Sequence, residues 1–179
     1  TIIINDVCQG YKDFQYVTQR PIPGVKVYSA HRGSVMSHSF GMGIGAKIAD
    51  QKKNVQIFTG DGCFRYFGAS LCYAKNFGLT IWVMDNGNYH IVDKGLDVVM
   101  PGIDRQRHHS YLPSTDFVSL AKAQDWEGIM LKPELSNLKT IMNQIYSGST
   151  MLVQMPIDGN IVVGQNPRLL HLKKHGAYL

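Results

Sequence analysis

The chain has 179 residues, of which 44% are hydrophobic and 17% are charged, a balance typical of one globular domain with a sizeable core. This composition excludes a disordered tail, a collagen-like fibre and a low-complexity scaffold. No run reaches the roughly 18 to 20 consecutive apolar residues that a membrane span needs, and the first residues lack the pattern of a secretory signal. We therefore expect a soluble, cytoplasmic protein that does not contact the membrane.

The net charge of +5 comes from 18 Lys and Arg residues against 13 Asp and Glu residues. Such a balance is compatible with nucleic-acid binding, but the basic residues cluster over 105–109 and 168–175 without aromatic residues on which bases could stack. We interpret them as a solvated or partner-facing surface and expect no nucleic acid. The three cysteines form no CxxC pair, so neither a disulfide framework nor a metal cluster is indicated.

Apolar runs that predict strands alternate with segments of helical periodicity. In chain order we expect strands over 1–7 and 25–28 joined by a loop over 10–24, a helix over 39–50, a strand over 55–59, a helix over 67–76, a strand over 79–84, a helix from a Ser114-Thr115-Asp116 cap to 124, a strand over 128–131, a helix opened by Pro133 and ending near 146, and a strand over 151–155. Residues 89–113 show no regular period, and the tail shows a basic helical pattern only over 167–175.

Strands that are apolar throughout and alternate with helices predict an α/β fold. We expect a doubly wound, mostly parallel sheet of about six strands with helices on both faces. The domain should span residues 1–157, followed by a C-terminal tail over 158–179. In such sheets ligands bind beyond the carboxyl ends of the strands.

Polar motifs follow two successive strands, at 60–62 (Gly-Asp-Gly) and 85–88 (Asp-Asn-Gly-Asn). The two tips should lie close together, and their glycines allow a ligand to approach the backbone closely. Oxygens from Asp61, from the side chain of Asn86 and from a main-chain carbonyl after it are ligands that Mg²⁺ prefers. The residues indicate a magnesium and diphosphate site. The alternative is two ordinary turns, because Gly, Asp and Asn are common turn residues.

Three segments resemble, in order and spacing, the C-terminal diphosphate-binding domain of thiamine-diphosphate enzymes of the acetolactate synthase and pyruvate decarboxylase group. The motif at 60–62 followed by Asp85-Asn86 is similar to the family's GDG…NN signature. Residues 35–49 resemble the family's TMGFGLPAAIGAKLA, and residues 116–123 resemble DFVKLAEA. The resemblance covers nearly the whole chain and implies the thiamin diphosphate-binding fold, with thiamine diphosphate and Mg²⁺ as cofactors.

The resemblance also implies roles for individual residues. Asp61, the side chain of Asn86 and the carbonyl of Asn88 would bind Mg²⁺. Met36 would be the apolar wedge that bends the cofactor into a V shape, and the carbonyl near Ser34 would receive its 4′-amino group. The full expected cofactor-binding set is Ser34, Met36, His38, Gly60, Asp61, Gly62, Cys63, Asn86, Asn88 and Tyr89.

By the same resemblance, Gly62 and Cys63 would meet the diphosphate through main-chain N–H groups. The sequence departs from the family pattern at three places. Cys63 stands where Ser is frequent, Asp85 replaces the first Asn of the pair, and Ser37-His38 replaces Gly-Phe. Asp85 either adds negative charge near the phosphates or braces the loop. His38, the one candidate catalytic residue in this chain, either touches the diphosphate or substrate or is satisfied within its loop.

Only two of the 13 acidic residues, Glu127 and Glu134, are glutamates. Enzymes of this family need a glutamate against N1′ of the aminopyrimidine, and it comes from a pyrimidine-binding domain, usually of another chain. Both glutamates here lie in the half of the sequence away from the cofactor motifs. We therefore expect a split enzyme, in which this chain pairs with a pyrimidine-binding-domain subunit in an α2β2 heterotetramer.

The expected function is the cofactor-binding subunit of an enzyme that decarboxylates a 2-oxo acid or ligates the resulting carbanion to an acceptor, most like acetolactate synthase. Two alternatives stay open. One is the β subunit of a 2-oxoacid:ferredoxin oxidoreductase, whose motif also contains a DNG-type sequence, although this chain has no cysteine cluster. The other is a non-catalytic module that retains the fold, which the residues at positions 63 and 85 allow.

Overall fold

The structure, a computed structural model, describes residues 1–7, 22–29, 35–104, 110–161 and 174. Most of the predicted 10–24 loop and nearly all of the predicted tail helix over 167–175 lie outside the described residues. So do Ser34 and the basic cluster over 105–109. The domain boundary at residue 157 stays a prediction.

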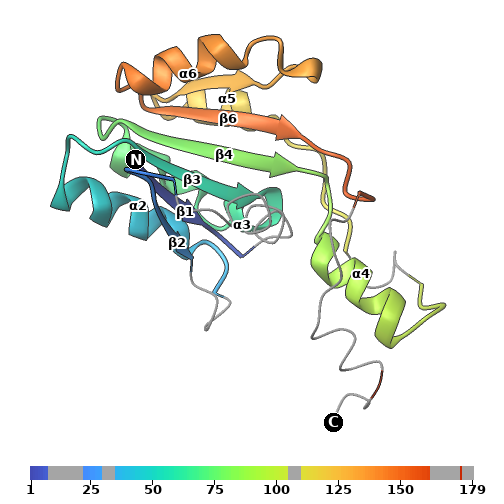
Figure 1. The fold of residues 1–179 in the computed structure, drawn as a ribbon. Coiled ribbons are helices and arrows are strands. Elements are labelled where there is room, and N and C mark those ends of the chain that lie inside the picture. Colours follow the sequence, from blue (N-terminus) through green and yellow to red (C-terminus); the bar gives the residue numbers. More distant parts are fainter. Residues whose placement is uncertain (8–21, 30–34, 105–109, 162–173, 175–179) are drawn as a thin grey trace.

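Within the described residues, six parallel strands form one sheet through the centre of the molecule (Figure 1). Their spatial order is β2-β1-β3-β4-β6-β5, which confirms the predicted doubly wound parallel sheet. The strands are β1 (Ile2–Asn5), β2 (Lys26–Ser29), β3 (Val55–Gly60), β4 (Leu79–Asp85), β5 (Glu127–Met130) and β6 (Met151–Pro156). The chain places β2 on one side of β1 and β3 on the other, so the strand order reverses between β1 and β3. Ligands bind at such switch points, beyond the carboxyl ends of the strands.

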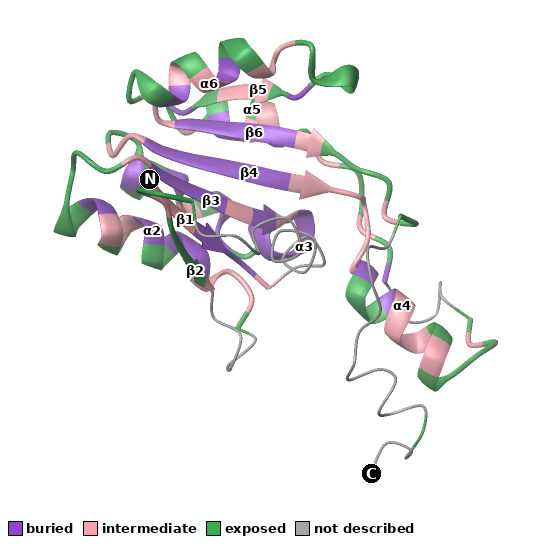
Figure 2. Ribbon diagram, viewed as in Figure 1, coloured by how far each residue is buried: buried purple, intermediate pink, exposed green. Residues whose placement is uncertain are grey.

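The central strands β3, β4 and β6 are largely apolar because both of their faces are covered (Figure 2). Successive side chains of a strand point to opposite faces. Ile57 and its neighbour Ile81 belong to one buried cluster, whereas Trp82 and Val153 belong to a second. The sheet therefore separates two apolar layers.

Helices cover both faces, as predicted. Phe40, Leu71 and Phe117 come from three helical segments and join the cluster around Ile57, whereas Ile141 joins the cluster around Trp82. The segments on the first face are α2 (His38–Ala49), the 3-10 helix η1 (Gly68–Ala74) and α5 (Phe117–Lys122), and α6 (Leu138–Tyr146) lies on the second. The predicted cap of α5 is confirmed, because the Asp116 carboxylate accepts the Ser119 N–H group at 2.9 Å.

One sequence prediction was wrong, because residues 89–113 are not without regular structure. They contain α4 (His90–Val99), which lies beyond the carboxyl end of the sheet (Figure 1). Apolar residues do recur at helical spacing from Ile91 to Val99, but the segment is short and Gly95 interrupts it. Both features weaken a helical signal in the sequence.

Two other helices differ in their extent. The stretch predicted over 67–76 is the 3-10 helix η1, preceded by a separate turn of helix, α3 (Asp61–Phe64). Pro133 opens only a 3-10 turn, η3 (Pro133–Leu135), in which Glu134 and Leu135 have φ values of 55° and 58°. Such left-handed residues cannot continue an α-helix, so α6 begins at Leu138.

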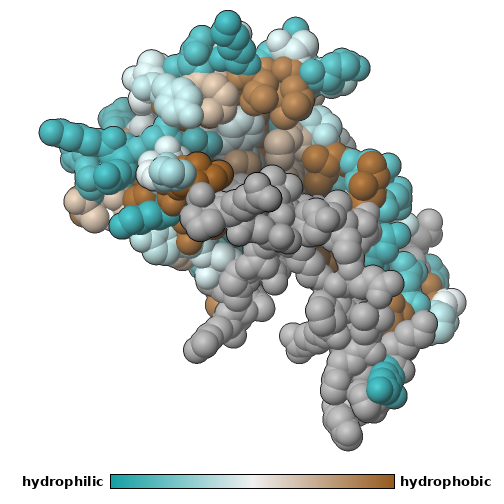
Figure 3. Space-filling view, viewed as in Figure 1, coloured by the Kyte–Doolittle hydropathy of each residue, from teal (hydrophilic) through white to brown (hydrophobic). Residues whose placement is uncertain are grey.

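The surface carries both hydrophobic and hydrophilic residues. Figure 3 shows apolar residues in separate patches with hydrophilic residues between them. On α4 the partly exposed apolar residues include Ile91, Val92 and Val99. None of the helices in the described part of the chain has the length and apolar character needed to cross a membrane.

Candidate cofactor site

A pocket of about 200 Å³ lies beyond the carboxyl ends of β1, β3 and β4. Its wall includes residues after each of these strands, and Ile157 closes it from the end of β6. Of the nine predicted cofactor-binding residues that the structure describes, eight line this pocket: Met36, Gly60, Asp61, Gly62, Cys63, Asn86, Asn88 and Tyr89. The tertiary structure thus gathers segments that are far apart in the sequence. Their binding roles stay predictions.

Asp61 lies where β3 passes directly into α3, and its side chain is almost fully buried. Burial, and secondly the charge of Asp85, raise the pKa of Asp61 to about 6, although the N–H groups of Gly62 and Gly87 act in the opposite direction. Its Oδ2 atom has no hydrogen-bond partner among the described residues. A buried carboxylate oxygen without a partner is costly, and a bound cation would satisfy it.

The tip of β4 is shaped by local hydrogen bonds. The side-chain oxygen of Asn86 accepts the Asn88 N–H group at 3.1 Å, and Gly87 between them has a φ of 65°, a conformation that glycine adopts without steric cost. The Oδ1 atom of Asn88 is buried and has no partner in the described part of the chain. Both tips therefore place oxygen atoms of the kind that Mg²⁺ prefers in one pocket.

Asp85 combines the two roles that the sequence left open. Its Oδ2 atom accepts a hydrogen bond from Nε2 of Gln154 at 2.7 Å, so its carboxylate braces the end of β4. It nevertheless lies near enough to Asp61 for its negative charge to raise the pKa of that group.

His38 is not among the described residues that line the pocket. Its Nδ1 atom lies 2.6 Å from the carbonyl oxygen of Val35 and 3.2 Å from Oδ1 of Asp6. Both neighbours are acceptors, so Nδ1 carries the proton in this arrangement. These contacts satisfy Nδ1, whereas the buried Nε2 atom of His38 has no hydrogen-bond partner among the described residues, so both interpretations of His38 stay open.

Tyr89 packs directly over Gly62. A Cβ atom at Gly62 would lie 2.5 Å from Cε1 of the tyrosine ring, so the close approach requires glycine. The main-chain N–H of Tyr89 donates to the carbonyl of Ser110 at 2.8 Å. Burial, and secondly a hydrogen bond with Tyr66, raise the pKa of the Tyr89 hydroxyl.

Cys63 is a structural thiol in this pocket. Its Sγ donates to the carbonyl of Val7 at 2.9 Å. Burial, and then the charge of Asp6, raise its pKa to about 12, so the thiol is protonated near neutral pH and is not activated as a nucleophile.

Sequence reasoning assigned no role to Asp6. Asp6 follows β1 at the switch point and is buried; an acid at the end of an apolar strand was the signal that could have found it. His90 lines the pocket and is buried, with Nε2 unpartnered among the described residues. Burial, and secondly the charge of Lys94, lower the pKa of His90.

Comparison with known proteins identifies the family of this chain. Residues 14–155 match the family described as thiamine pyrophosphate enzyme, C-terminal TPP binding domain. The chain belongs to this family. The matched residues include every described residue that lines the pocket except Val7 and Ile157.

Two individual proteins illustrate the similarity. The chain is 26% identical over 137 residues to the acetolactate synthase large subunit of Buchnera aphidicola subsp. Acyrthosiphon pisum (strain APS), an alignment that covers 72% of this chain and 23% of that protein. Its structure is similar to benzoylformate decarboxylase from Polynucleobacter necessarius, with a TM-score of 0.74, 19% sequence identity, and coverage of 92% of this chain and 31% of the other. The second likeness shows the fold. The chain thus spans less than a third of the length of either protein.

Proposed function

We propose that this chain provides the magnesium- and diphosphate-binding part of a thiamine-diphosphate enzyme that acts on a 2-oxo acid. The enzyme would decarboxylate this acid or join the resulting carbanion to an acceptor, in the manner of an acetolactate synthase. The observation that carries the proposal is the pocket itself, into which the ends of β3 and β4 bring Asp61, Asn86 and Asn88. The buried Oδ2 atom of Asp61 lacks a partner among the described residues, as expected of an atom that awaits a cation. The carbonyl of Asn88, the proposed third ligand, also accepts the N–H group of His90 at 2.8 Å.

The roles follow from the positions of the residues. Asp61, the side chain of Asn86 and the carbonyl of Asn88 would hold Mg²⁺, and the N–H groups of Gly62 and Cys63 would bind the diphosphate. When bound, thiamine diphosphate supplies the nucleophilic carbon and the electron sink. The residues of this chain bind and orient the cofactor.

The glutamate that such chemistry needs would come from a pyrimidine-binding domain outside these residues. Glu127 accepts hydrogen bonds from Gln144 and Ser149 beside the edge strand β5, and Glu134 lies in the η3 turn. Neither belongs to the described residues that line the pocket. We propose a partner subunit as the source, in a heterotetramer with two copies of each chain.

Calorimetry on the complete protein, purified with any polypeptide that accompanies it, tests the binding proposal. Asp61→Asn should weaken the binding of thiamine diphosphate with Mg²⁺ by about a hundredfold or more, because the amide cannot supply the negative charge. The matched control is Asp125→Asn, at an exposed aspartate outside the pocket whose φ of 61° suits asparagine. Binding that is indifferent to Asp61→Asn would favour the non-catalytic module.

The remaining alternatives need separate experiments. If the cofactor binds, product assays for acetolactate or acetoin, set beside an assay with ferredoxin as electron acceptor, distinguish the two enzyme classes. Mass spectrometry of the purified protein shows whether a second polypeptide accompanies this chain. A single polypeptide that decarboxylates a 2-oxo acid without a partner would contradict the split organisation.

A further inference from the structure

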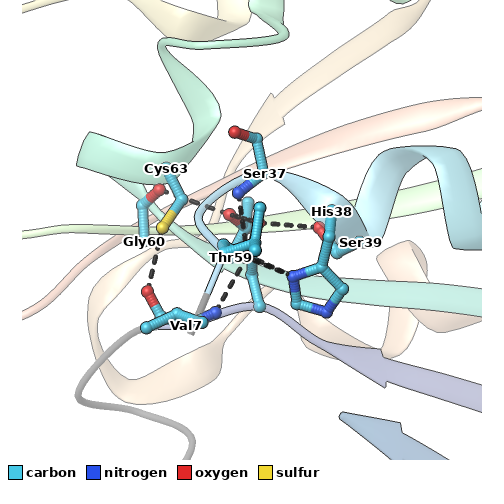
Figure 4. Close-up of polar contacts among 9 residues, drawn as sticks. Val7, Ser37, His38, Ser39, Thr59, Gly60 and Cys63 are labelled. Atoms are coloured by element: carbon cyan, nitrogen blue, oxygen red, sulfur yellow. Dashed lines mark hydrogen bonds and ion pairs between the residues drawn. The ribbon is translucent and has the colours of Figure 1, made fainter. Parts of the chain in front are cut away.

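The carboxylate of Asp6 is the centre of a buried hydrogen-bond network. Five described groups donate hydrogen bonds to it. They come from the end of β1, the end of β3 and the start of α2, and Figure 4 labels the residues that carry them. Oδ1 accepts from Val7 N at 2.9 Å, Ser37 N at 3.0 Å and His38 Nδ1 at 3.2 Å, and Oδ2 accepts from Ser39 Oγ at 2.8 Å and Thr59 Oγ1 at 3.0 Å. An ionised carboxylate only accepts hydrogen bonds, so these five donors satisfy both of its oxygen atoms.

One of these donors stands in an unfavourable backbone conformation. Ser37 has φ 68° and ψ 2°, a left-handed conformation that costs energy for any residue other than glycine. Strained residues persist only where their surroundings hold them, and here Asp6 accepts the N–H of Ser37 itself.

The same network reaches two walls of the cofactor pocket. Met36 directly precedes Ser37, and Gly60 directly follows Thr59; both line the pocket. The β3 wall is also held by the sheet, because β3 pairs with β1 on one side and β4 on the other. Residues 35–37 belong to no strand, so their place depends far more on Asp6.

We propose that Asp6 is a positioning residue that fixes Met36 relative to Gly60 and Asp61 and thereby sets the affinity for thiamine diphosphate. This inference rests on the proposed function. It makes a selective prediction, because Met36 would contact the organic body of the cofactor and not its phosphates. Loss of the Asp6 carboxylate should weaken binding of the whole cofactor more than binding of inorganic pyrophosphate with Mg²⁺.

The test compares Asp6→Asn, Asp61→Asn and the wild type, all as the complete protein, at a temperature where circular dichroism shows each to be folded. Calorimetry measures the affinity for thiamine diphosphate and for inorganic pyrophosphate, each with Mg²⁺. Asp6→Asn should lower the affinity for thiamine diphosphate by about tenfold, as expected for the loss of charge-assisted hydrogen bonds. It should lower the affinity for pyrophosphate by less than about threefold. Asp61→Asn should weaken both.

The outcomes separate the two proposals. A wild-type protein that binds neither ligand overturns the proposed function and this inference with it. If the wild type binds and Asp6→Asn leaves both affinities unchanged, Asp6 serves the fold alone and the inference fails. An equal loss for both ligands also overturns it, because the effect would then lie in the β3 wall.

Rescue by a second change tests the strain at Ser37. Glycine adopts the left-handed conformation without a carboxylate to hold it, so adding Ser37→Gly to Asp6→Asn should restore the affinity for thiamine diphosphate to within about threefold of wild type. If Asp6→Asn does not fold, Ser39→Ala removes one donor and keeps the carboxylate. This variant should lose less affinity than Asp6→Asn, and again more for thiamine diphosphate than for pyrophosphate. Absence of any selective loss in that variant, or of rescue in the double variant, would overturn the inference.

Discussion

The side-chain amide of Gln154 donates to Oδ2 of Asp85 at 2.7 Å and joins the end of β4 to the start of α5. The same amide group donates to the carbonyl of Thr115 at 3.3 Å, and its oxygen accepts the N–H of Phe117 at 3.2 Å. One buried glutamine thus supports the strand end that carries Asn86. Its environment explains why β6, an otherwise apolar strand, contains a polar residue.

Gln154→Ala should lower the free energy of unfolding by about 2 to 3 kcal/mol, because it leaves the Asp85 carboxylate and the Phe117 N–H group unpaired. Urea denaturation measures this change. The matched control is Gln144→Ala, at a half-buried glutamine whose hydrogen bond to Glu127 is exposed, and it should cost less than about 1 kcal/mol. Equal losses in the two variants would contradict the bracing role of Gln154.

The pH dependence of stability should report Asp61 when metal and cofactor are removed by a chelator. Its pKa is about 6 in the folded protein against 3.8 for an ordinary aspartate, so between these values the folded state binds more protons than the unfolded state. Stability should therefore fall as the pH rises from about 4 to about 6, by up to about 3 kcal/mol.

Thermal denaturation across this pH range, with wild type and Asp61→Asn side by side, measures the effect. The asparagine variant should lose this part of the pH dependence. Asp85→Asn should keep it but shift its upper end to lower pH, because one of the two causes of the raised pKa is removed. A pH profile that is identical in the wild type and Asp61→Asn would refute the assignment.

Gly62→Ala should destabilise the protein by about 1 to 3 kcal/mol, because the new methyl group would overlap the ring of Tyr89. Adding Tyr89→Leu should recover part of that loss in a double-mutant cycle. Gly45→Ala is the control: nothing lies within 4 Å of its Cβ position on α2, and helix propensity should make it neutral or stabilising. Additive effects of the changes at 62 and 89 would contradict the contact.

Ser37→Gly should stabilise the wild-type protein by up to about 1 kcal/mol, because it relieves the left-handed strain at φ 68° while glycine adds entropy to the unfolded chain. The side chain of Ser37 makes no capping hydrogen bond, so none is lost. Thermal denaturation checks the change, with Ser37→Ala as a control that keeps the strain and should bring no gain. A melting temperature that falls with glycine would show that the turn is not strained.

The strands and the two polar tips could be predicted from the sequence because their signals are local. Buried parallel strands are largely apolar, and runs such as 79–84 are recognisable without knowing their neighbours. The tips follow these runs directly, so the topology of a parallel sheet brings Asp61 and Asn86 to one edge. The helix α4 escaped prediction because its pattern is short and interrupted.

The sequence by itself determined the alternation of strands and helices, the placement of the polar motifs after β3 and β4, and the resemblance to a family. Only the tertiary structure decided which polar groups from distant parts of the chain form hydrogen bonds with one another. Asp6 reaches Ser37 and Thr59, and Gln154 reaches Asp85, over separations of 31, 53 and 69 residues. The physical reason is that a hydrogen bond between distant residues leaves no periodic trace in the chain, whereas the burial of a strand or helix face does.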